Sequence, residues 1–159
     1  MALVTSKRPL PFESQGLSKQ SNSRPETAER GISIAGLRNL EETVKRLCDE
    51  GRFAEDKTFD IFYPGTRDYA KLTTTQFVSM WVKDPAVTGN RRLADCPDII
   101  DQSCIGPPTI FMSHAWRGSL ASLLKIAFDF VAEKNLPDGT KFWLDMVCKR
   151  LFLLCTPPS

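Results

Sequence analysis

The residues best suited to chemistry in this chain lie in two short motifs in its last third. The first motif is Ser-His-Ala-Trp-Arg at 113–117, and it holds His114, the only histidine of the chain. The second is Phe-Trp-Leu-Asp at 142–145, which ends in Asp145. A carboxylate in an apolar run needs a partner, and an imidazole can supply one. The bond can orient His114 or a ligand hydroxyl for function, or it can be purely structural.

The sequence around these motifs predicts a strand, a helix and a second strand. Residues 109–113 form a short apolar run after two prolines, which indicates a buried strand, and 142–147 form a second apolar run. Residues 119–134 have helical spacing with Ser119 as the N-cap, and their apolar side chains predict a helix covered on most sides. We therefore expect a βαβ unit with a parallel strand pair and a right-handed crossover.

The carboxyl ends of the two strands are expected to bring the motif side chains to one edge of the sheet. Ligands of parallel α/β sheets lie beyond this edge, and the amino end of the helix, which favours anions, points there too. A phosphate or another anion can then rest against Arg117, Gly118 and Ser119, although His114 and Trp116 can equally be packing residues. The candidate ligand-binding residues are Ser113, His114, Trp116, Arg117, Ser119 and Asp145.

The cysteines indicate neither a nucleophile nor a metal site. Cys148 follows the second strand as a buried thiol, and the chain has no second histidine to activate it. The five cysteines are an odd number without a CxxC pair, so zinc-ribbon spacing and a disulfide framework are both lacking. Such a pattern is typical of reduced thiols in an intracellular protein. We expect a cytoplasmic location, no metal, and a transit peptide only as the lesser alternative for the basic, Ser-rich start.

The composition limits the classes of partner. The chain has 159 residues, which predicts one domain or one small domain with flexible segments. Its 21 basic and 19 acidic residues give a net charge of +2, so no electrostatic argument favours nucleic acid or an anionic membrane as partner. No apolar stretch approaches the roughly 20 residues that a membrane-spanning helix needs.

The two motifs together resemble those of a known group of sequences. Phe111-Met-Ser-His-Ala-Trp116, followed by a helix and Phe142-Trp-Leu-Asp145, is similar to the F-[IV]-S-H-A-W … F-W-[ILV]-D proteins of algae, oomycetes and other protists. The segment from Leu72 to Gly106 also resembles the region that precedes that motif. The domain is in turn similar to Toll/interleukin-receptor-like (TIR-like) domains, and its second strand resembles that of fungal heterokaryon-incompatibility domains.

The resemblance implies a flavodoxin-like sheet and a role in signalling, in self-association or, in catalytic members, in cleavage of NAD at its glycosidic bond. Ser113 and His114 match the end of the first strand, and Asp145 matches the acidic end of the second. Catalytic TIR-like members place a glutamate on a later helix, and no glutamate follows Glu133 here. We therefore expect a protein-interaction or signalling module without catalysis or cofactor, whose partner is a copy of itself or a full-length relative. The alternatives are an NAD-cleaving or nucleotide-binding domain whose catalytic parts lie in a longer form, and a plain scaffold.

The rest of the chain is expected to flank a partial TIR-like α/β domain at 107–147. Residues 1–30 are polar and predict a disordered tail, and 148–159 form an atypical apolar tail. Two strands and one helix are too small to bury their own faces, so we expect a truncated isoform or fragment. Residues 31–106 predict a helical and irregular pre-domain with, in order, a helix over 34–50, a short strand near 59–63, a helix over 73–83 and a loop-rich link over 84–106.

Overall fold

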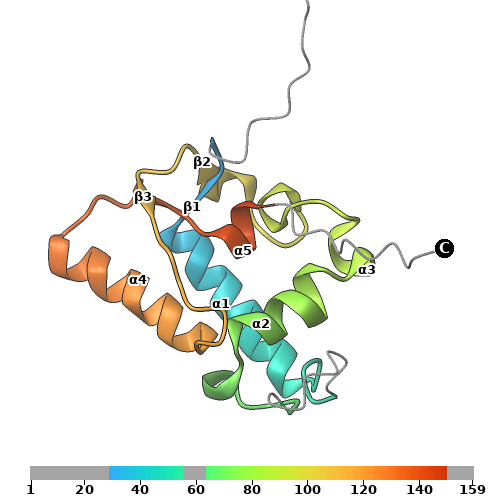
Figure 1. Ribbon diagram of the computed structural model, residues 1–159. Coiled ribbons are helices and arrows are strands. Elements are labelled where there is room, and N and C mark those ends of the chain that lie inside the picture. The colour runs from blue at the N-terminus through green and yellow to red at the C-terminus, as the bar shows by residue number, and fades with distance from the viewer. Residues whose placement is uncertain (1–28, 56–63, 150–159) are drawn as a thin grey trace, which may run out of the picture.

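A mixed four-stranded sheet with helices forms an α/β fold in the computed structural model, which describes residues 29–55 and 64–149 (Figure 1). The predicted strand near 59–63, nearly all of the predicted N-terminal tail and all but the first two residues of the C-terminal tail lie outside the described residues. Across the sheet the strands follow the order β2-β1-β4-β3. Their bounds are Gly31–Ser33 for β1, Ile105–Gly106 for β2, Ile110–Phe111 for β3 and Lys141–Trp143 for β4.

The predicted strand–helix–strand unit is confirmed. β3 and β4 pair in parallel, and the helix α4, Leu120–Lys134, connects them. The helix begins after Ser119, whose side chain accepts a hydrogen bond from the backbone N–H of Ser122, as expected of an N-cap. It ends at Asn135, which adopts the left-handed conformation that commonly closes a helix.

The expectation of a parallel sheet is wrong outside the β3–β4 pair. β1 lies between β2 and β4 and pairs antiparallel with both. The sequence pattern predicts neither β1 nor β2, because strands of three and two residues are too short to show alternation. β1 also runs directly into a helix. The predicted division at residue 106 falls inside this one sheet, since β1 and β2 precede it and β3 and β4 follow it.

The first predicted helix is confirmed as α1, Ile34–Asp49. Ser33 is its N-cap and accepts a hydrogen bond from the Gly36 N–H at 3.2 Å. Its apolar stripe, Leu37, Leu40 and Val44, is buried. The helix therefore packs on the rest of the chain with the face that the sequence pattern indicates.

The second predicted helix changes form after one turn. α2, Thr74–Phe77, begins with a capping box, in which Thr73 and Gln76 satisfy each other's backbone N–H groups. The chain continues as a π-helix, Val78–Val82. The predicted loop-rich link then contains short helical elements. These are α3, Pro85–Thr88; η4, Leu93–Asp95; and η5, Gln102–Cys104. Two further short helices lie outside the link: η2, Tyr69–Lys71, and α5, Asp145–Cys148.

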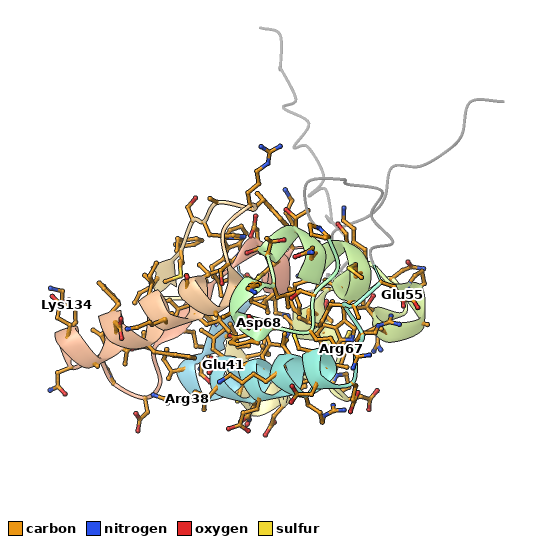
Figure 2. All side chains as sticks on the ribbon, turned by 90° about the horizontal axis from the view of Figure 1, so that it is seen from below. Arg38, Glu41, Glu55, Arg67, Asp68 and Lys134 are labelled. Atoms are coloured by element: carbon orange, nitrogen blue, oxygen red, sulfur yellow. The ribbon has the colours of Figure 1, made fainter. Side chains whose placement is uncertain are left out.

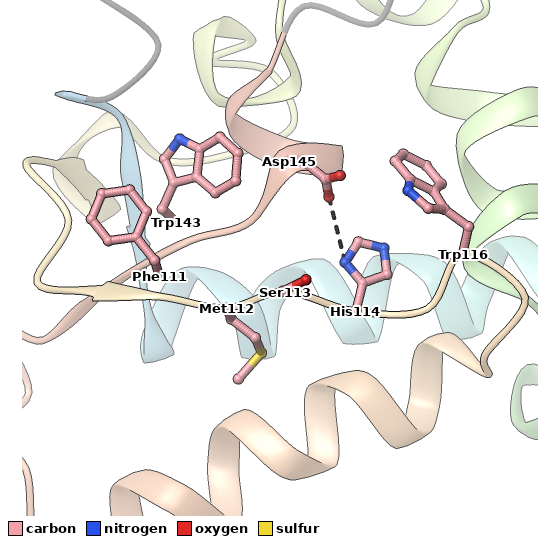
Figure 3. Close-up of a pocket in the computed structure, with 7 residues that line it drawn as sticks. All are labelled: Phe111, Met112, Ser113, His114, Trp116, Trp143 and Asp145. Carbon is pink, nitrogen blue, oxygen red and sulfur yellow. Dashed lines mark ion pairs between the residues drawn. The ribbon is translucent and has the colours of Figure 1, made fainter.

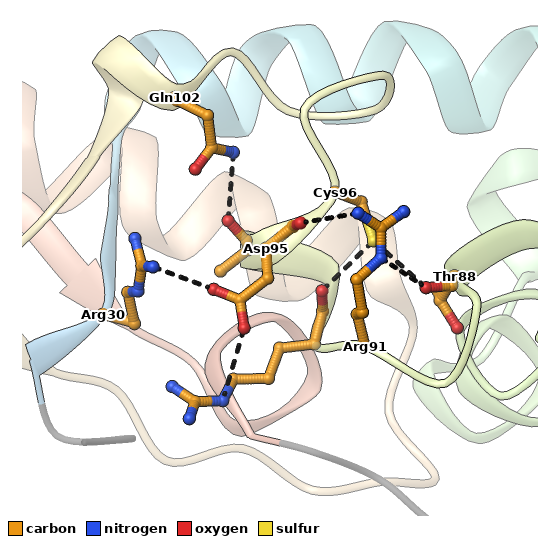
Figure 4. A network of polar contacts seen from close by, with 8 residues as sticks. Arg30, Thr88, Arg91, Asp95, Cys96 and Gln102 are labelled. Carbon is orange, nitrogen blue, oxygen red and sulfur yellow. Dashed lines mark hydrogen bonds and ion pairs between the residues drawn. The ribbon is translucent and has the colours of Figure 1, made fainter. Parts of the chain in front are cut away.

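A polar network fixes the link that precedes β2 (Figure 4). Asp95 of η4 forms ion pairs with Arg30 at 3.1 Å and with Arg92 at 3.6 Å. The side chain of Gln102 donates a hydrogen bond to the carbonyl oxygen of Ala94 at 3.1 Å. Arg30 directly precedes β1, so these contacts hold the link against the start of that strand.

Arg38 and Glu41, two side chains of α1 that Figure 2 labels, contact neighbouring helices. The guanidinium of Arg38 lies 5.0 Å from the ring centroid of Phe128 on α4. The hydroxyl of Tyr69 donates a hydrogen bond to Glu41 at 3.1 Å, and burial together with this carboxylate raises the pKa of Tyr69. α1 is therefore held between α4 and η2.

The two faces of the β3–β4 pair differ in burial. Phe142 is fully buried and belongs to the same apolar cluster as residues of α1 and α4, together with its β1 partner Ile32. Because side chains alternate along a strand, Phe111 and Trp143 lie on the opposite face. Phe111 is 68% exposed, so the expectation that 109–113 is a buried strand is wrong for this side chain. It lies on β3, which is the edge strand of the sheet that the described residues form.

The expectation that 119–134 is covered on most sides is also wrong. α4 buries Leu120, Leu123, Leu124 and Ala127, which form a single face. Ile126 is 60% exposed, because the residues that the structure describes provide one packing layer for this helix and not two. Within the same residues, no helix has the length and apolar content needed to cross a membrane.

Candidate functional site

A cavity of about 230 Å³ lies beyond the carboxyl ends of β3 and β4 (Figure 3). This is the edge at which the sequence predicts a site. Its lining combines aromatic side chains, one carboxylate, one imidazole and one hydroxyl. The lining residues are Phe111, Met112, Ser113, His114, Trp116, Trp143 and Asp145.

The backbone around β3 holds the first motif in place. The N–H of Met112 donates to the carbonyl oxygen of Trp143 at 3.0 Å and so continues the contact between the strands. Further along, the carbonyl oxygen of Trp116 accepts from both the backbone N–H and the hydroxyl of Thr75, at 2.9 and 2.8 Å. The first turn of α2 therefore anchors the loop that carries His114 and Trp116.

Asp145 reaches the cavity from a different element than expected. It is predicted within the strand 142–147, but β4 ends at Trp143 and Asp145 is the first residue of α5. Its carboxylate oxygen Oδ1 accepts a hydrogen bond from the N–H of Met146 at 2.8 Å. The prediction of a longer strand is wrong, because apolar residues of a short buried helix look the same in sequence as those of a buried strand.

His114 and Asp145 face each other, as the sequence analysis proposes. Nδ1 of His114 lies 3.4 Å from Oδ1 of Asp145, which is longer than an ordinary hydrogen bond. The side chain of His114 is 4% exposed and that of Asp145 is 24% exposed. A carboxylate can only accept hydrogen bonds, so this placement favours a proton on Nδ1, and in the neutral ring Nε2 is then an acceptor. Nε2 is buried and has no hydrogen-bond partner among the residues that the structure describes.

Aromatic rings flank this pair on two sides (Figure 3). The ring centroids of Phe111 and Trp143 are 5.8 Å apart with a tilt of 38° between the planes. On the other side, the Trp116 ring lies 5.2 Å from the imidazole of His114. Both separations lie within the range of aromatic contacts. The polar pair therefore lies between aromatic surfaces.

The structure separates the predicted anion-binding residues from this cavity. Arg117 and Ser119 are not among its lining residues. The hydroxyl of Ser119 donates a hydrogen bond to the carbonyl oxygen of Ala70 at 2.9 Å. The backbone N–H of Leu120 donates to the carbonyl oxygen of Leu72, also at 2.9 Å. The polar groups at the start of α4 therefore bond to residues 70–72 of the chain. Of the six predicted site residues, Ser113, His114, Trp116 and Asp145 lie together.

The sequence analysis misses three residues that line the cavity. Phe111, Met112 and Trp143 fall within runs that it assigns to strands, so none of them is named as a site residue. The available signal is the alternation along two parallel strands, which places Phe111 and Trp143 on one face and Phe142 on the other. This alternation identifies Phe111 and Trp143 as cavity residues only when β3 is known to be an edge strand.

The thiol of Cys148, which lies in the same helix as Asp145, is unreactive at neutral pH. Cys148 is fully buried, and burial raises its pKa from 9.0 to about 11. At neutral pH it is therefore a thiol and not a thiolate, which is the nucleophilic form. Among residues 29–55 and 64–149, no three His, Cys, Asp or Glu side chains are grouped so that they could hold a metal ion.

We expect Cys48 and Cys148 to resist alkylation in the folded protein at pH 8. Both are fully buried, and burial raises the pKa of each to about 11. Treatment with iodoacetamide followed by peptide mass spectrometry should find both unmodified without denaturant and both modified in urea. Modification of either at the same rate in both conditions would contradict the buried placement.

The same pKa shifts predict a loss of stability in alkali. The thiols ionise near pH 9.0 when unfolded and near pH 11 when folded. Their contribution to folding is complete below about pH 9 and is lost as the pH rises through about 11, because ionisation then favours the unfolded chain. The urea midpoint should therefore fall between pH 8 and pH 10.5, and replacement of Cys148 by alanine should reduce that fall.

Comparisons with protein-family models, with curated proteins and with solved structures give no match for this chain. The class of protein is therefore described by its architecture. The chain is an α/β protein with a mixed sheet and an aromatic-lined cavity at the carboxyl edge of its parallel strand pair.

Proposed function

We propose that this chain is a protein-interaction or signalling module of TIR-like type that acts without catalysis. The observation that carries the proposal is the exposed Phe111 on the edge strand β3, in contact with Trp143 of the neighbouring strand. A large aromatic side chain at a strand edge is a common feature of protein contacts, since aromatic anchors provide much of the binding energy of interfaces.

The parallel β3–α4–β4 unit supports the flavodoxin-like, TIR-like interpretation, whereas the antiparallel β1 is an addition to that pattern. In α/β proteins, helices normally cover both faces of parallel strands. Here the face with Phe142 is buried and the face with Phe111 is exposed. At Phe111 the described residues leave this second face exposed, and another molecule could cover it there.

The partner that we favour is a second copy of this chain. An edge strand offers unpaired backbone groups whose natural complement is another edge strand. Two copies related by a twofold axis can place their β3 edges and their Phe111 rings against each other. The net charge of +2 is small, so repulsion between copies is weak.

The cavity gives little support to an NAD-cleaving function. Asp145 is its one carboxylate, and no lysine or arginine lines it to hold phosphate groups. A nucleotide-binding role is the second candidate, in which the His114–Asp145 pair would contact the sugar or the base. Incubation of the protein with NAD tests cleavage, because measurable turnover would overturn the non-catalytic proposal.

We expect reversible self-association that depends on Phe111. Light scattering coupled to size exclusion should show the mean mass of the wild-type chain rising with concentration. Phe111→Ser should remain monomeric, because it removes the apolar anchor without touching the core. Ile126→Ser is the matched control, since Ile126 is also strongly exposed but lies on α4. A wild-type mass that stays monomeric, or equal losses in both variants, would contradict the proposed interface.

A further inference from the structure

We propose that the cavity beyond β3 and β4 binds a protonated alkylamine, either a small free amine or the side chain of a lysine. This site goes beyond the self-association proposed above and does not depend on it, although both involve Phe111. The juxtaposition that carries the proposal is the Asp145 carboxylate between aromatic rings, next to a buried histidine nitrogen without a partner.

The charge of the lining selects a cation. Asp145 contributes a carboxylate, and neither lysine nor arginine is among the lining residues. Among the described residues, its contacts with Met146 and His114 are both made through Oδ1, and Oδ2 takes no part in them. The Asp145 side chain lines the cavity and is 24% exposed, so its carboxylate is open to solvent. An anion would meet only this negative charge.

The aromatic walls fit the same ligand class. Phe111 and Trp143 form one wall, and Trp116 stands on the other side of the polar pair (Figure 3). The faces of aromatic rings attract cations, and tryptophan does so most strongly. An alkylammonium ion can therefore place its charge near the carboxylate and its methylene groups against the rings.

His114 explains why an amine with N–H groups is expected. In the neutral ring with its proton on Nδ1 toward Asp145, Nε2 is an acceptor, and within residues 29–55 and 64–149 this buried atom has no partner. A buried polar atom left unpaired is unfavourable, so a ligand that donates a hydrogen bond to it gains affinity. In Figure 3 the ring lies between Asp145 and Trp116, where an ammonium group bound at the carboxylate would be close to it.

The test is a titration of the isotopically labelled protein with n-butylammonium, followed by NMR at a concentration where the chain is monomeric. We expect saturable shifts in the tryptophan and His114 signals. Neutral 1-butanol, of similar size, should bind more weakly by a factor of about ten or more, because it lacks the charge that the carboxylate and the rings attract. Equal binding of the alcohol would overturn the proposal.

Two variants separate the site from general electrostatics. Asp145→Asn keeps the size and the hydrogen-bonding oxygen of the side chain, and it should weaken binding of butylammonium by about tenfold or more. Asp129→Asn is the matched control, because Asp129 is an exposed carboxylate of α4 that pairs with Lys125 outside the cavity. Unchanged affinity in Asp145→Asn, with a spectrum that shows a folded protein, would overturn the proposal, as would equal losses in both variants.

Peptides distinguish the two sources of the amine. A short Gly/Ser peptide with one central lysine is compared with the same peptide carrying acetylated lysine, which has no charge. Tighter binding of the lysine peptide than of butylammonium assigns the site to a partner protein, and weaker binding assigns it to a free amine. Equal binding of the acetylated peptide would overturn the amine site, whereas the self-association measurement is unaffected by either result.

Discussion

Replacement of Phe142 by alanine is expected to lower the free energy of unfolding by about 3–5 kcal/mol. Phe142 is fully buried in the middle of the sheet. It lies opposite Ile32 of β1 on one side and Ile110 of β3 on the other, so its ring contributes to packing on both neighbouring strands. The loss is large because domains are stable by only about 5–15 kcal/mol. Urea denaturation followed by tryptophan fluorescence measures it.

Phe111 provides the matched comparison for this result. It is one residue further along the neighbouring strand, yet it is 68% exposed. Phe111→Ala is expected to change the free energy of unfolding by about 1 kcal/mol or less. Similar losses in the two variants would show that both faces of the β3–β4 pair are covered in the monomer. That outcome would also remove the basis for self-association through Phe111.

The sequence predicts the two long helices, α1 and α4, and the start of α2 well because their signals are local. α1 has an apolar stripe and a serine N-cap, and α2 has a complete capping box in four residues. α4 is found from its N-cap and its length. Each of these features depends on residues a few positions apart, so no knowledge of the tertiary structure is needed to recognise them.

The strands are harder because their length and burial depend on distant residues. β1 has three residues, and it is a strand only because β2 and β4 lie on either side of it. The run after Phe142 is apolar because it packs against other parts of the chain. It would be equally apolar as a strand, and the structure shows that it forms the short helix α5. The burial of Phe111 depends on whether a further strand or layer covers β3, which no local pattern states.

The candidate site is predicted in part for the same reason. The parallel βαβ unit brings the ends of its two strands to one edge, and this alone joins His114 to Asp145. The anion site at the start of α4 rests on the assumption that its first groups are free. Instead, Ser119 and Leu120 bond to the segment of η2, which lies far away in sequence. Contacts of that kind decide which part of a predicted edge is open to a ligand.

Gly36 is a position at which a single added carbon should disturb the packing of α1 on the sheet. A Cβ atom there would lie 2.8 Å from Cβ of Cys104 and 2.8 Å from Cγ1 of Ile32. Both neighbours are buried, in η5 and β1, and cannot swing into solvent. We expect Gly36→Ala to lower the free energy of unfolding by about 1–3 kcal/mol, because the helix α1 must move away from the sheet. This loss would occur although alanine is the better helix former.

Gly139 is the control for that prediction. It lies in the turn before β4, and a Cβ there would meet no atom within 4 Å. Gly139→Ala should leave stability unchanged or raise it slightly, since alanine restricts the unfolded chain. A loss in Gly36→Ala no larger than that in Gly139→Ala would mean that α1 does not approach β1 as closely as the structure shows. If the difference is found, the contact between α1 and the central strand β1 is one of those that stabilise the sheet. The sequence pattern does not predict this contact.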